Sequence, residues 1–261
     1  MAHVENVWTY PIKGLDATEL ETGRLTEAGT LSGDRRYALV DPSGEAHNGK
    51  QIETLHEITS EYDLETGRLT LSVDNRENTD QFDLPDERDA AGEWFSEFVG
   101  EPLELRRRGP PSFVDRPDLG PSVISTETLE EVASWFEWMT PESARRRLRP
   151  NVEIGGVPAF WEDQFLGEDA PEFEIGSVRF EGAEACARCV VPSRDPETGE
   201  PTERFRERFI ERREATLPEW VDEDALEHFY TVMVITNVPD AGRGETIRVG
   251  DPVSIDGGAD E

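Results

Sequence analysis

Short runs of β-forming residues, each ended by proline or glycine, recur along this chain. Val4–Tyr10 ends at Pro11, and Arg36–Val40 ends at an Asp41-Pro-Ser-Gly44 turn. Proline lacks a backbone N–H and glycine tolerates positive φ, so both residues favour tight turns between strands. The pattern predicts a mainly β, α+β fold in which helices are the minority.

The remaining elements follow from the same signals. Further strands are predicted at Glu19–Leu25, at Tyr62–Leu64 and Leu69–Val73 around a Glu65-Thr-Gly67 turn, at Val152–Ile154, at Glu174–Phe180 as two short strands, at Tyr230–Asn237, and at Ile247–Ile255 as a closing hairpin. Helices are predicted at Asp89–Val99, from an N-cap at Ser125 or Thr126 to about Met139, at Glu142–Leu148 and at Glu203–Glu214. The last helix has a narrow apolar face, so we interpret its charged pairs as a solvated surface.

A break in regular structure divides the chain into two parts. Arg106-Arg-Arg-Gly-Pro-Pro-Ser112 lacks periodicity, and the loop signals continue to Gly120-Pro121. We therefore expect a β domain over residues 1–112, a second domain with peripheral helices over residues 113–256, and a loose tail over residues 257–261.

The chain is strongly acidic. It has 58 acidic and 26 basic residues, a formal net charge of −32, and only two lysines. The acids are interleaved with apolar residues, which argues against a disordered acidic tail. At molar salt the Debye length is about 3 Å and self-repulsion is screened, so the composition indicates a halophilic source. Binding to nucleic acid through the overall field is disfavoured.

No stretch of the sequence resembles a membrane or export segment. A membrane helix needs about 18 or more consecutive apolar residues, and no such run is present. Met1-Ala-His-Val-Glu5 is also unlike the basic and then apolar start of a signal peptide. We expect a soluble, cytoplasmic protein without a membrane partner.

Both cysteines lie in one motif, Cys186-Ala-Arg-Cys189, at the end of predicted extended backbone. Two cysteines are too few for a secreted disulfide scaffold, and one C-x-x-C supplies half of the ligands of a typical zinc site. A thioredoxin-like pair opens a helix, for which Val190-Val191-Pro192 is a poor start. On chemistry alone, the two cysteines are equally consistent with a structural pair and with a functional thiolate.

Four cations stand at the ends of predicted elements, namely Lys13, Arg36, Arg149 and Arg188. Each alone reads as a surface ion pair, for which about 0–1 kcal/mol is typical. Together they could bind an anion, because guanidinium groups hold phosphate oxygens bidentately and the helix start near Ser125 adds backbone N–H donors. The sharper hypothesis is a phosphate-bearing cofactor beside a soft thiolate.

Several motifs, in order along nearly the whole chain, resemble those of the MOSC family (molybdenum cofactor sulfurase C-terminal domain). They are Tyr10-Pro-Ile-Lys-Gly14, Gly33-Asp-Arg-Arg-Tyr37, Ser125-Thr126 before a helix, Arg149-Pro-Asn151, Cys186-Ala-Arg-Cys189 followed by Asp195-Pro-Glu-Thr-Gly199, and Val249-Gly-Asp-Pro-Val253. The chain is most similar to the amidoxime-reducing component and its bacterial relatives. The resemblance implies an N-terminal MOSC-type β domain followed by a MOSC β-barrel with peripheral helices.

The resemblance also implies a site and a reaction. The second cysteine of the C-x-R-C element is the molybdenum ligand in that family, which assigns Cys189 as metal ligand and catalytic residue. The residues implied around the pterin of the Mo-molybdopterin cofactor and its phosphate are Lys13, Gly14, Arg36, Ser125, Thr126, Arg149, Ala187 and Arg188. The implied activity is a molybdenum-dependent oxidoreductase that reduces small N-hydroxylated compounds. Pyridoxal phosphate binding also belongs to the general description of the family.

Three points qualify this resemblance. Gly14 stands where relatives often have serine, which leaves one cofactor hydrogen bond to backbone or water. Two cysteines cannot hold a four-cysteine iron–sulfur cluster, so we expect electrons from a separate donor of the ferredoxin, cytochrome or flavoprotein type. Cys186 we interpret as packing. A non-catalytic carrier of molybdenum cofactor and a Cys189 persulfide sulfur-transfer protein remain the alternatives.

The acidic composition generates a first prediction. If it is an adaptation to salt, the melting temperature should climb markedly between low and molar KCl, because screening removes repulsion among the carboxylates. Thermal unfolding followed by circular dichroism across a KCl series measures this. A flat or falling curve would contradict the halophilic interpretation.

Overall fold

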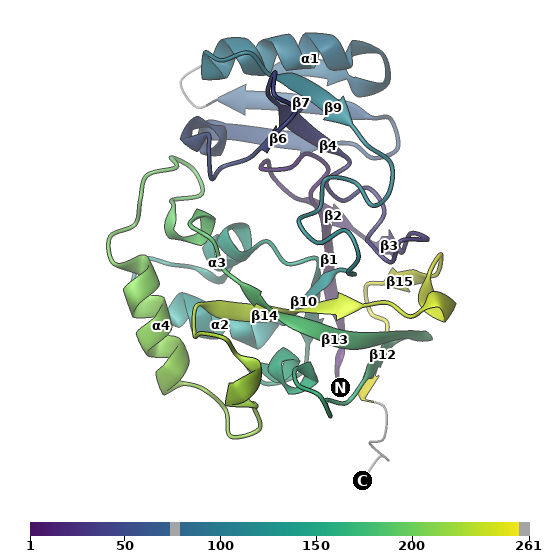
Figure 1. Cartoon of the computed structure of the whole chain (residues 1–261), viewed down its shortest axis with the longest axis vertical. Coiled ribbons are helices and arrows are strands. Elements are labelled where there is room, and N and C mark those ends of the chain that lie inside the picture. Colours follow the sequence, from purple (N-terminus) through teal and green to yellow (C-terminus); the bar gives the residue numbers. More distant parts are fainter. Residues whose placement is uncertain (74–78, 256–261) are drawn as a thin grey trace.

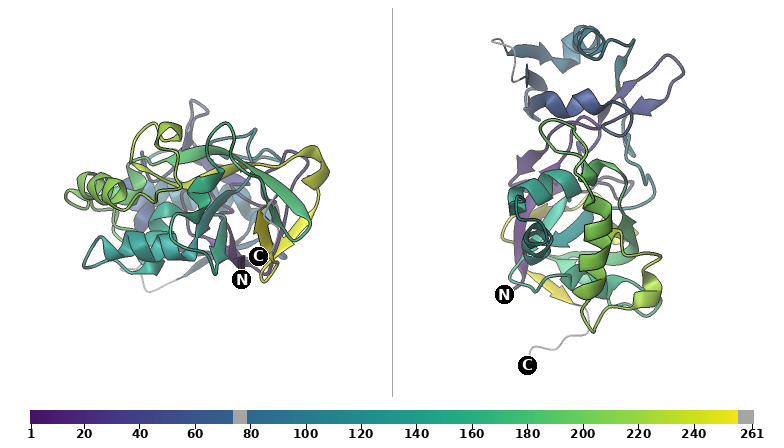
Figure 2. Two further views of the ribbon diagram at one scale, coloured as in Figure 1. Left: turned by 90° about the horizontal axis from the view of Figure 1, so that it is seen from below. Right: turned by 90° about the vertical axis from the view of Figure 1, so that its left-hand side faces the viewer.

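The structure is a computed structural model that describes residues 1–73 and 79–255. It has two stacked parts (Figure 1). One part holds a helix over small sheets near one end of the long axis, and the other holds a large curled sheet with helices beside it (Figures 1 and 2). The mainly β, α+β fold is confirmed.

The large sheet comprises eight strands of the described residues and curls into a half-barrel. In spatial order they are β16 (Val253–Ile255), β12 (Phe173–Ile175), β13 (Val178–Ala187), β14 (Thr231–Asn237), β10 (Ser122–Ser125), β11 (Val152–Gly155), β1 (His3–Thr9) and β2 (Thr18–Leu20). Only β10 and β11 are a parallel pair in this sheet. Parallel neighbours need a crossover, and α2 (Thr126–Ser134) and α3 (Pro141–Leu148) provide it.

The other part is built mainly from residues 37–107. One small sheet contains β5 (Ala46–His47), β4 (Tyr37–Val40) and β9 (Glu104–Arg107), and another contains β6 (Ile58–Tyr62), β7 (Arg68–Val73) and β8 (Asp80–Asp83). α1 (Leu84–Val99) packs on them and buries Phe95 completely. β3 (Thr22–Arg24) pairs with β15 (Thr246–Arg248), so the two ends of the chain meet.

Several predicted boundaries move. α1 begins at Leu84 because Pro85 occupies its first turn, and α2 ends at Ser134 rather than near Met139. β9 carries regular structure as far as Arg107. The predicted boundary at residue 112 stays a prediction, and β1 and β2 belong to the large sheet. The predicted tail over residues 257–261 lies outside the described residues.

The predicted closing hairpin at Ile247–Ile255 is wrong. Its two strands do not pair with each other, because β15 pairs with β3 and β16 pairs with β12. The residues between them bond to β1 instead. Gly250 N donates to Val4 O at 2.8 Å, and Asp251 O accepts from Val4 N at 2.9 Å. A strand distant in sequence therefore takes the hydrogen bonds that a hairpin turn would have closed.

α4 (Phe205–Ala215) is more than a solvated helix. It runs alongside the large sheet (Figures 1 and 2), and Phe205 and Phe209 are buried as predicted. Arg213 on the same helix is also fully buried, where it donates to the Asp163 carboxylate and lies over the Phe160 ring, 4.1 Å from its centroid. Burial raises the pKa of Asp163, and the charge of Arg213 opposes that shift.

This ion pair generates a second prediction. Arg213→Met should lower the free energy of unfolding by roughly 3–5 kcal/mol, because Asp163 would lose the partner of its buried charge. Arg212→Met is the matched control, since Arg212 is exposed on the same helix and should change stability by less than about 0.5 kcal/mol. Urea unfolding of both variants at one salt concentration measures the difference. Equal stability of the two variants would contradict a role for the buried pair.

Candidate functional site

A cavity of about 790 Å³ opens between the two parts of the molecule. Its walls include Gly14 and His56 from the first part, and the end of α3 and the segment after β13 from the second. All of these segments are connections or element ends. A site assembled in this way depends on how the two parts meet rather than on any single motif.

Positive charge lines this cavity. Among the described residues, its walls contain eight arginines and both lysines of the chain, against four carboxylates. The cations are Lys13, Arg35, Lys50, Arg116, Arg145, Arg146, Arg147, Arg149, Arg188 and Arg194, and the acids are Asp16, Asp34, Asp115 and Glu142. On a chain of net charge −32, this concentration of cations favours an anionic ligand.

Two of the eight arginines stand apart. Six have a carboxylate oxygen within 4 Å: Arg35, Arg116, Arg145, Arg146, Arg147 and Arg194. Arg149 and Arg188 have none within residues 1–73 and 79–255, and donate to backbone carbonyls or sulfur instead. Their charge is therefore not neutralised by an adjacent carboxylate.

Arg149 is held by the end of α3. It caps this helix in the left-handed conformation, with φ 58° and ψ 54°, which is uncommon for a residue with a side chain. Its guanidinium lies over the Tyr10 ring, 4.0 Å from the centroid, and donates to Leu15 O at 2.7 Å. Burial lowers the pKa of Arg149. The strained backbone directs the side chain into the cavity wall rather than along the helix.

Arg188 lies between the two cysteines. Its Nη1 donates to Cys186 Sγ at 2.8 Å and its Nη2 to Leu148 O at 2.9 Å. Its Nε is buried and has no hydrogen-bond partner among the described residues. Buried donors are normally satisfied, so this N–H is an unmet donor on a residue that lines the cavity.

Cys189 follows the end of β13 and is partly buried. Tyr230 Oη donates to Cys189 O at 3.2 Å, and burial raises the pKa of Tyr230 to about 12, which keeps the phenol a donor at neutral pH. Cys186 packs in an apolar cluster with Phe209, which supports its interpretation as packing, although it also accepts the bond from Arg188. Neither thiol forms a disulfide.

An irregularity in the sheet accompanies the cysteines. The register shifts between Ala185 and Ala187, where two steps on β13 face three on β14. Met233 in this part of β14 has a φ of 67°. Such bulges bend a strand and redirect its side chains, and they are frequent beside functional sites. The bulge helps to set the direction in which the chain leaves β13 toward Cys189.

Lys13 and Gly14 line the cavity from the first part. Lys13 Nζ donates to Phe113 O at 2.9 Å and to Asp115 Oδ1 at 2.5 Å. Burial raises the pKa of Asp115, but Lys13 more than offsets this, so the pKa is lowered. Gly14 has a φ of 95°, and a Cβ there would lie 3.1 Å from Asn48. This backbone position favours glycine over serine for steric reasons.

Three residues inferred for the site do not line the cavity: Arg36, Ser125 and Thr126. Arg35 lines it in place of Arg36, lying over the Tyr10 ring 4.7 Å from its centroid. Ser125 does cap α2, but it is fully buried, and the buried Glu162 already accepts hydrogen bonds from Ser125 N and Thr128 Oγ1 at 3.1 Å each. A carboxylate thus occupies the helix start that was expected to bind phosphate.

The described residues contain no cluster of three or more histidine, cysteine, aspartate or glutamate side chains able to hold a metal ion. A metal in the cavity would therefore have to take most of its ligands from a cofactor. All four residues of the motif, Cys186 to Cys189, line the cavity, and Cys189 is the more exposed of the two thiols, which are soft donors.

Comparison with known families accounts for this arrangement. The MOSC N-terminal beta barrel domain matches residues 1–102, and the MOSC domain matches residues 121–254. This chain belongs to the MOSC family. The cavity lies where the two MOSC modules meet, because Lys13 and Arg35 belong to the first match and Arg149, Arg188 and Cys189 to the second.

The MOSC chain has distant named relatives. It is 25% identical over 233 residues to mitochondrial amidoxime reducing component 2 of Bos taurus, covering 75% of this chain and 67% of that protein. It is 26% identical over 239 residues to mitochondrial amidoxime-reducing component 1 of Homo sapiens, with the same two coverages. It is 25% identical to the human molybdenum cofactor sulfurase, covering 81% of this chain but 28% of that enzyme.

The described part of this MOSC chain also bears on membrane association. Over residues 1–73 and 79–255, no helix has both the length and the apolar character needed to cross a bilayer.

Proposed function

We propose that this protein holds molybdenum cofactor in the cavity, with Cys189 as the protein ligand of the metal, and reduces small N-hydroxylated compounds. The observation that carries the proposal is the pair of guanidinium groups, Arg149 and Arg188, which have no carboxylate partner among the described residues and line the same cavity as the partly buried thiol of Cys189. Such a site suits a ligand that carries both a phosphate and a soft metal.

The residues present fit this cofactor. The unsatisfied Nε of Arg188 supplies a donor that awaits an acceptor, and Arg149 supplies a charged donor for phosphate. Gly14 and Ala187 present little side chain, so the backbone can approach a planar ring system. Lys13 would add charge, although Asp115 shares it. Arg35, which the structure adds to this set, completes the positive wall beside Tyr10.

The proposed reaction balances as a two-electron reduction. When bound, the cofactor supplies the two-electron redox chemistry at the N–O bond. That bond breaks, an N–H bond forms, and water leaves after two protons and two electrons have been taken up. The electrons come from a separate protein of the ferredoxin, cytochrome or flavoprotein type. The chain itself holds the anionic end of the cofactor and excludes bulk water from Cys189.

The relatives include both amidoxime-reducing components and molybdenum cofactor sulfurases, at about the same identity to this chain. The matched amidoxime-reducing components share two thirds of their length with this chain, whereas the sulfurases share less than a third of theirs. A carrier of the cofactor and a Cys189 persulfide protein are the other candidates. Both would use the same cavity, so the chemistry on Cys189 has to be measured directly.

The deciding experiment is the analysis of protein made in a host that synthesises the cofactor. We expect molybdenum and pterin near one per chain, and reduction of benzamidoxime with reduced methyl viologen as electron donor. Metal-free protein that carries sulfane sulfur on Cys189 would contradict the reductase function and support sulfur transfer. Protein that contains the cofactor but does not reduce benzamidoxime would contradict the reductase function and support the carrier.

Substitution of the two cysteines gives a third prediction. Cys189→Ser should abolish reductase activity and molybdenum retention, because a hydroxyl is a harder and far less acidic ligand than a thiol. Cys186→Ser should keep much of both, since serine can still accept the hydrogen bond from Arg188. Metal content and turnover measured on both variants test this. Equal loss of metal would instead indicate a site made by two thiols.

Arg149 gives a fourth prediction. Each charge-assisted contact to phosphate is worth roughly 1.5–3 kcal/mol, so Arg149→Ala should lose about one to two powers of ten in cofactor affinity. The variant should purify folded but depleted in pterin and molybdenum. Arg212→Ala, on the exposed face of α4, should keep the wild-type content. Full occupancy of the Arg149→Ala protein would exclude this residue from the phosphate site.

A further inference from the structure

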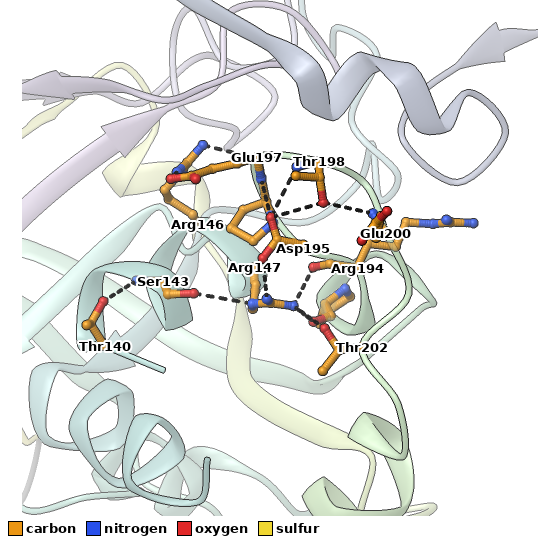
Figure 3. A network of polar contacts seen from close by, with 12 residues as sticks. Thr140, Ser143, Arg146, Arg147, Arg194, Asp195, Glu197, Thr198, Glu200 and Thr202 are labelled. Atoms are coloured by element: carbon orange, nitrogen blue, oxygen red, sulfur yellow. Dashed lines mark hydrogen bonds and ion pairs between the residues drawn. The ribbon is translucent and has the colours of Figure 1, made fainter. Parts of the chain in front are cut away.

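Arg147 is a buried arginine around which the segment after Cys189 folds. Its side chain comes from α3 and is 2% exposed, and Figure 3 shows its guanidinium among the residues that follow the cysteine. In the segment after the cysteine its partners are Pro192 O at 2.9 Å, Arg194 O, and two side chains at 3.4 Å, Thr202 Oγ1 and Asp195 Oδ2. On its own helix the partner is Ser143 Oγ at 3.3 Å. Burial lowers the pKa of Arg147 to about 10, which leaves it charged at neutral pH.

The segment that Arg147 holds is a wall of the cavity. We call residues 190–202 the cysteine loop, because it begins directly after Cys189. Val191, Arg194 and Pro196 of this loop line the cavity. Arg146 supports the same loop by donating to Pro196 O at 3.1 Å. The loop has little regular structure of its own, namely the short 3-10 turn Val191–Ser193 and an isolated antiparallel bridge between Arg194 and Pro201, where Thr202 N donates to Ser193 O at 2.6 Å. Arg147 adds donors for two further carbonyls, those of Pro192 and Arg194.

The chain is also tied to α3 on the other side of Cys189. Arg188, the preceding residue, donates to Leu148 O in the last turn of that helix at 2.9 Å. Arg147 donates to the carbonyls of Pro192 and Arg194, three and five residues after Cys189. Cys189 is thus bracketed by two guanidinium–carbonyl ties to one helix.

The same helix ends at Arg149. Only Leu148 separates Arg147 from the cap residue Arg149, which lies over Tyr10. The fork of an arginine can bond several carbonyls at once in a fixed geometry, which a lysine cannot reproduce. α3 therefore connects the cationic end of the cavity to the thiol end.

We propose that Arg147 is a positioning residue that fixes Cys189 relative to Arg149. Its importance for catalysis rests on the proposed function, in which Cys189 binds the metal and Arg149 binds the phosphate of one rigid cofactor. In this role Arg147 contacts neither the metal nor the phosphate. It sets the distance between the two residues that do.

The test uses the cofactor-free full-length chain, made in a host without the cofactor pathway, and carries Cys186→Ser so that Cys189 is the single thiol. The alkylation rate of Cys189 by iodoacetamide is measured with amide hydrogen exchange over residues 190–202. Arg147→Met should raise both rates by about tenfold, because the loop loses its central donor and opens locally. Arg147→Lys should fall between Arg147→Met and the parent protein.

Arg213→Met is the control for general loss of stability. Arg213 is equally buried on α4 but contacts Asp163 and Thr231 O rather than the cysteine loop. The alkylation and hydrogen-exchange rates of the Arg213→Met protein should stay within about twofold of those of the parent protein under conditions where the fold is intact. An Arg147→Met protein within this range, or an Arg213→Met protein with an equal rise, overturns the proposal. If Arg147→Met does not fold, Arg147→Lys decides by the same comparison.

The loaded protein gives an independent readout. The Mo(V) electron paramagnetic resonance signal of Arg147→Lys should broaden, because Cys189 would adopt more than one position, whereas that of Arg213→Met should keep the wild-type line shape. An unchanged signal in Arg147→Lys overturns the positioning role. Wild-type protein without molybdenum would defeat the proposed function, while the alkylation rates would still decide whether Arg147 positions Cys189.

Discussion

Guanidinium groups that donate to backbone carbonyls hold the cavity of this protein together. Arg147, Arg149 and Arg188 each bond carbonyls in loops, in a short turn or at the end of a helix. Carbonyls at element ends have no partner of their own, and burying them unsatisfied costs free energy. Arginine suits this role because its fork bonds several acceptors and keeps its charge when buried. Scaffold and positive potential therefore come from the same side chains.

Under the proposed function, this arrangement explains how a very acidic protein keeps a site for an anion. Most cavity arginines are paired with carboxylates, so their main contribution is structural. The unpaired guanidinium groups of Arg149 and Arg188 supply the attraction at short range. In a salt-rich medium, long-range attraction is screened within a few ångströms, whereas contact pairs in a partly buried cavity are screened much less. Recognition would then depend on contacts inside the cavity.

The MOSC family membership and the geometry point to the same place in the fold. The parallel pair β10 and β11 requires a crossover, and that crossover brings α3 and Arg149 to the cavity. The connection between β13 and β14 brings Cys189 to the same wall. The first module closes the cavity with Lys13 and Arg35. Neither module alone contains the whole site, which is why the interface between them matters more than either sheet.

Local signals in the sequence were sufficient for many of the strands and turns and for the cysteine motif. Alternation, proline and glycine act over a few residues, so β7 and the cap at Ser125 follow from neighbours in the chain, whereas β6 shares only Tyr62 with the strand expected at Tyr62–Leu64. The C-x-x-C motif and the Arg149-Pro-Asn sequence likewise marked two parts of the site that the structure brings together. These features depend on contacts close in sequence.

Only the tertiary structure decided which neighbours face the cavity. Arg35 and Arg36 are equivalent in the sequence, but the φ of 45° at Arg35 accompanies its place over Tyr10. Ser125 caps its helix as expected, yet Glu162, distant in the chain, fills the helix start. Arg147 is the last of three consecutive arginines in the sequence, and only the structure shows that it is buried and that the loop after Cys189 folds around it. Side-chain direction and burial depend on what packs there from afar, and no local pattern records that.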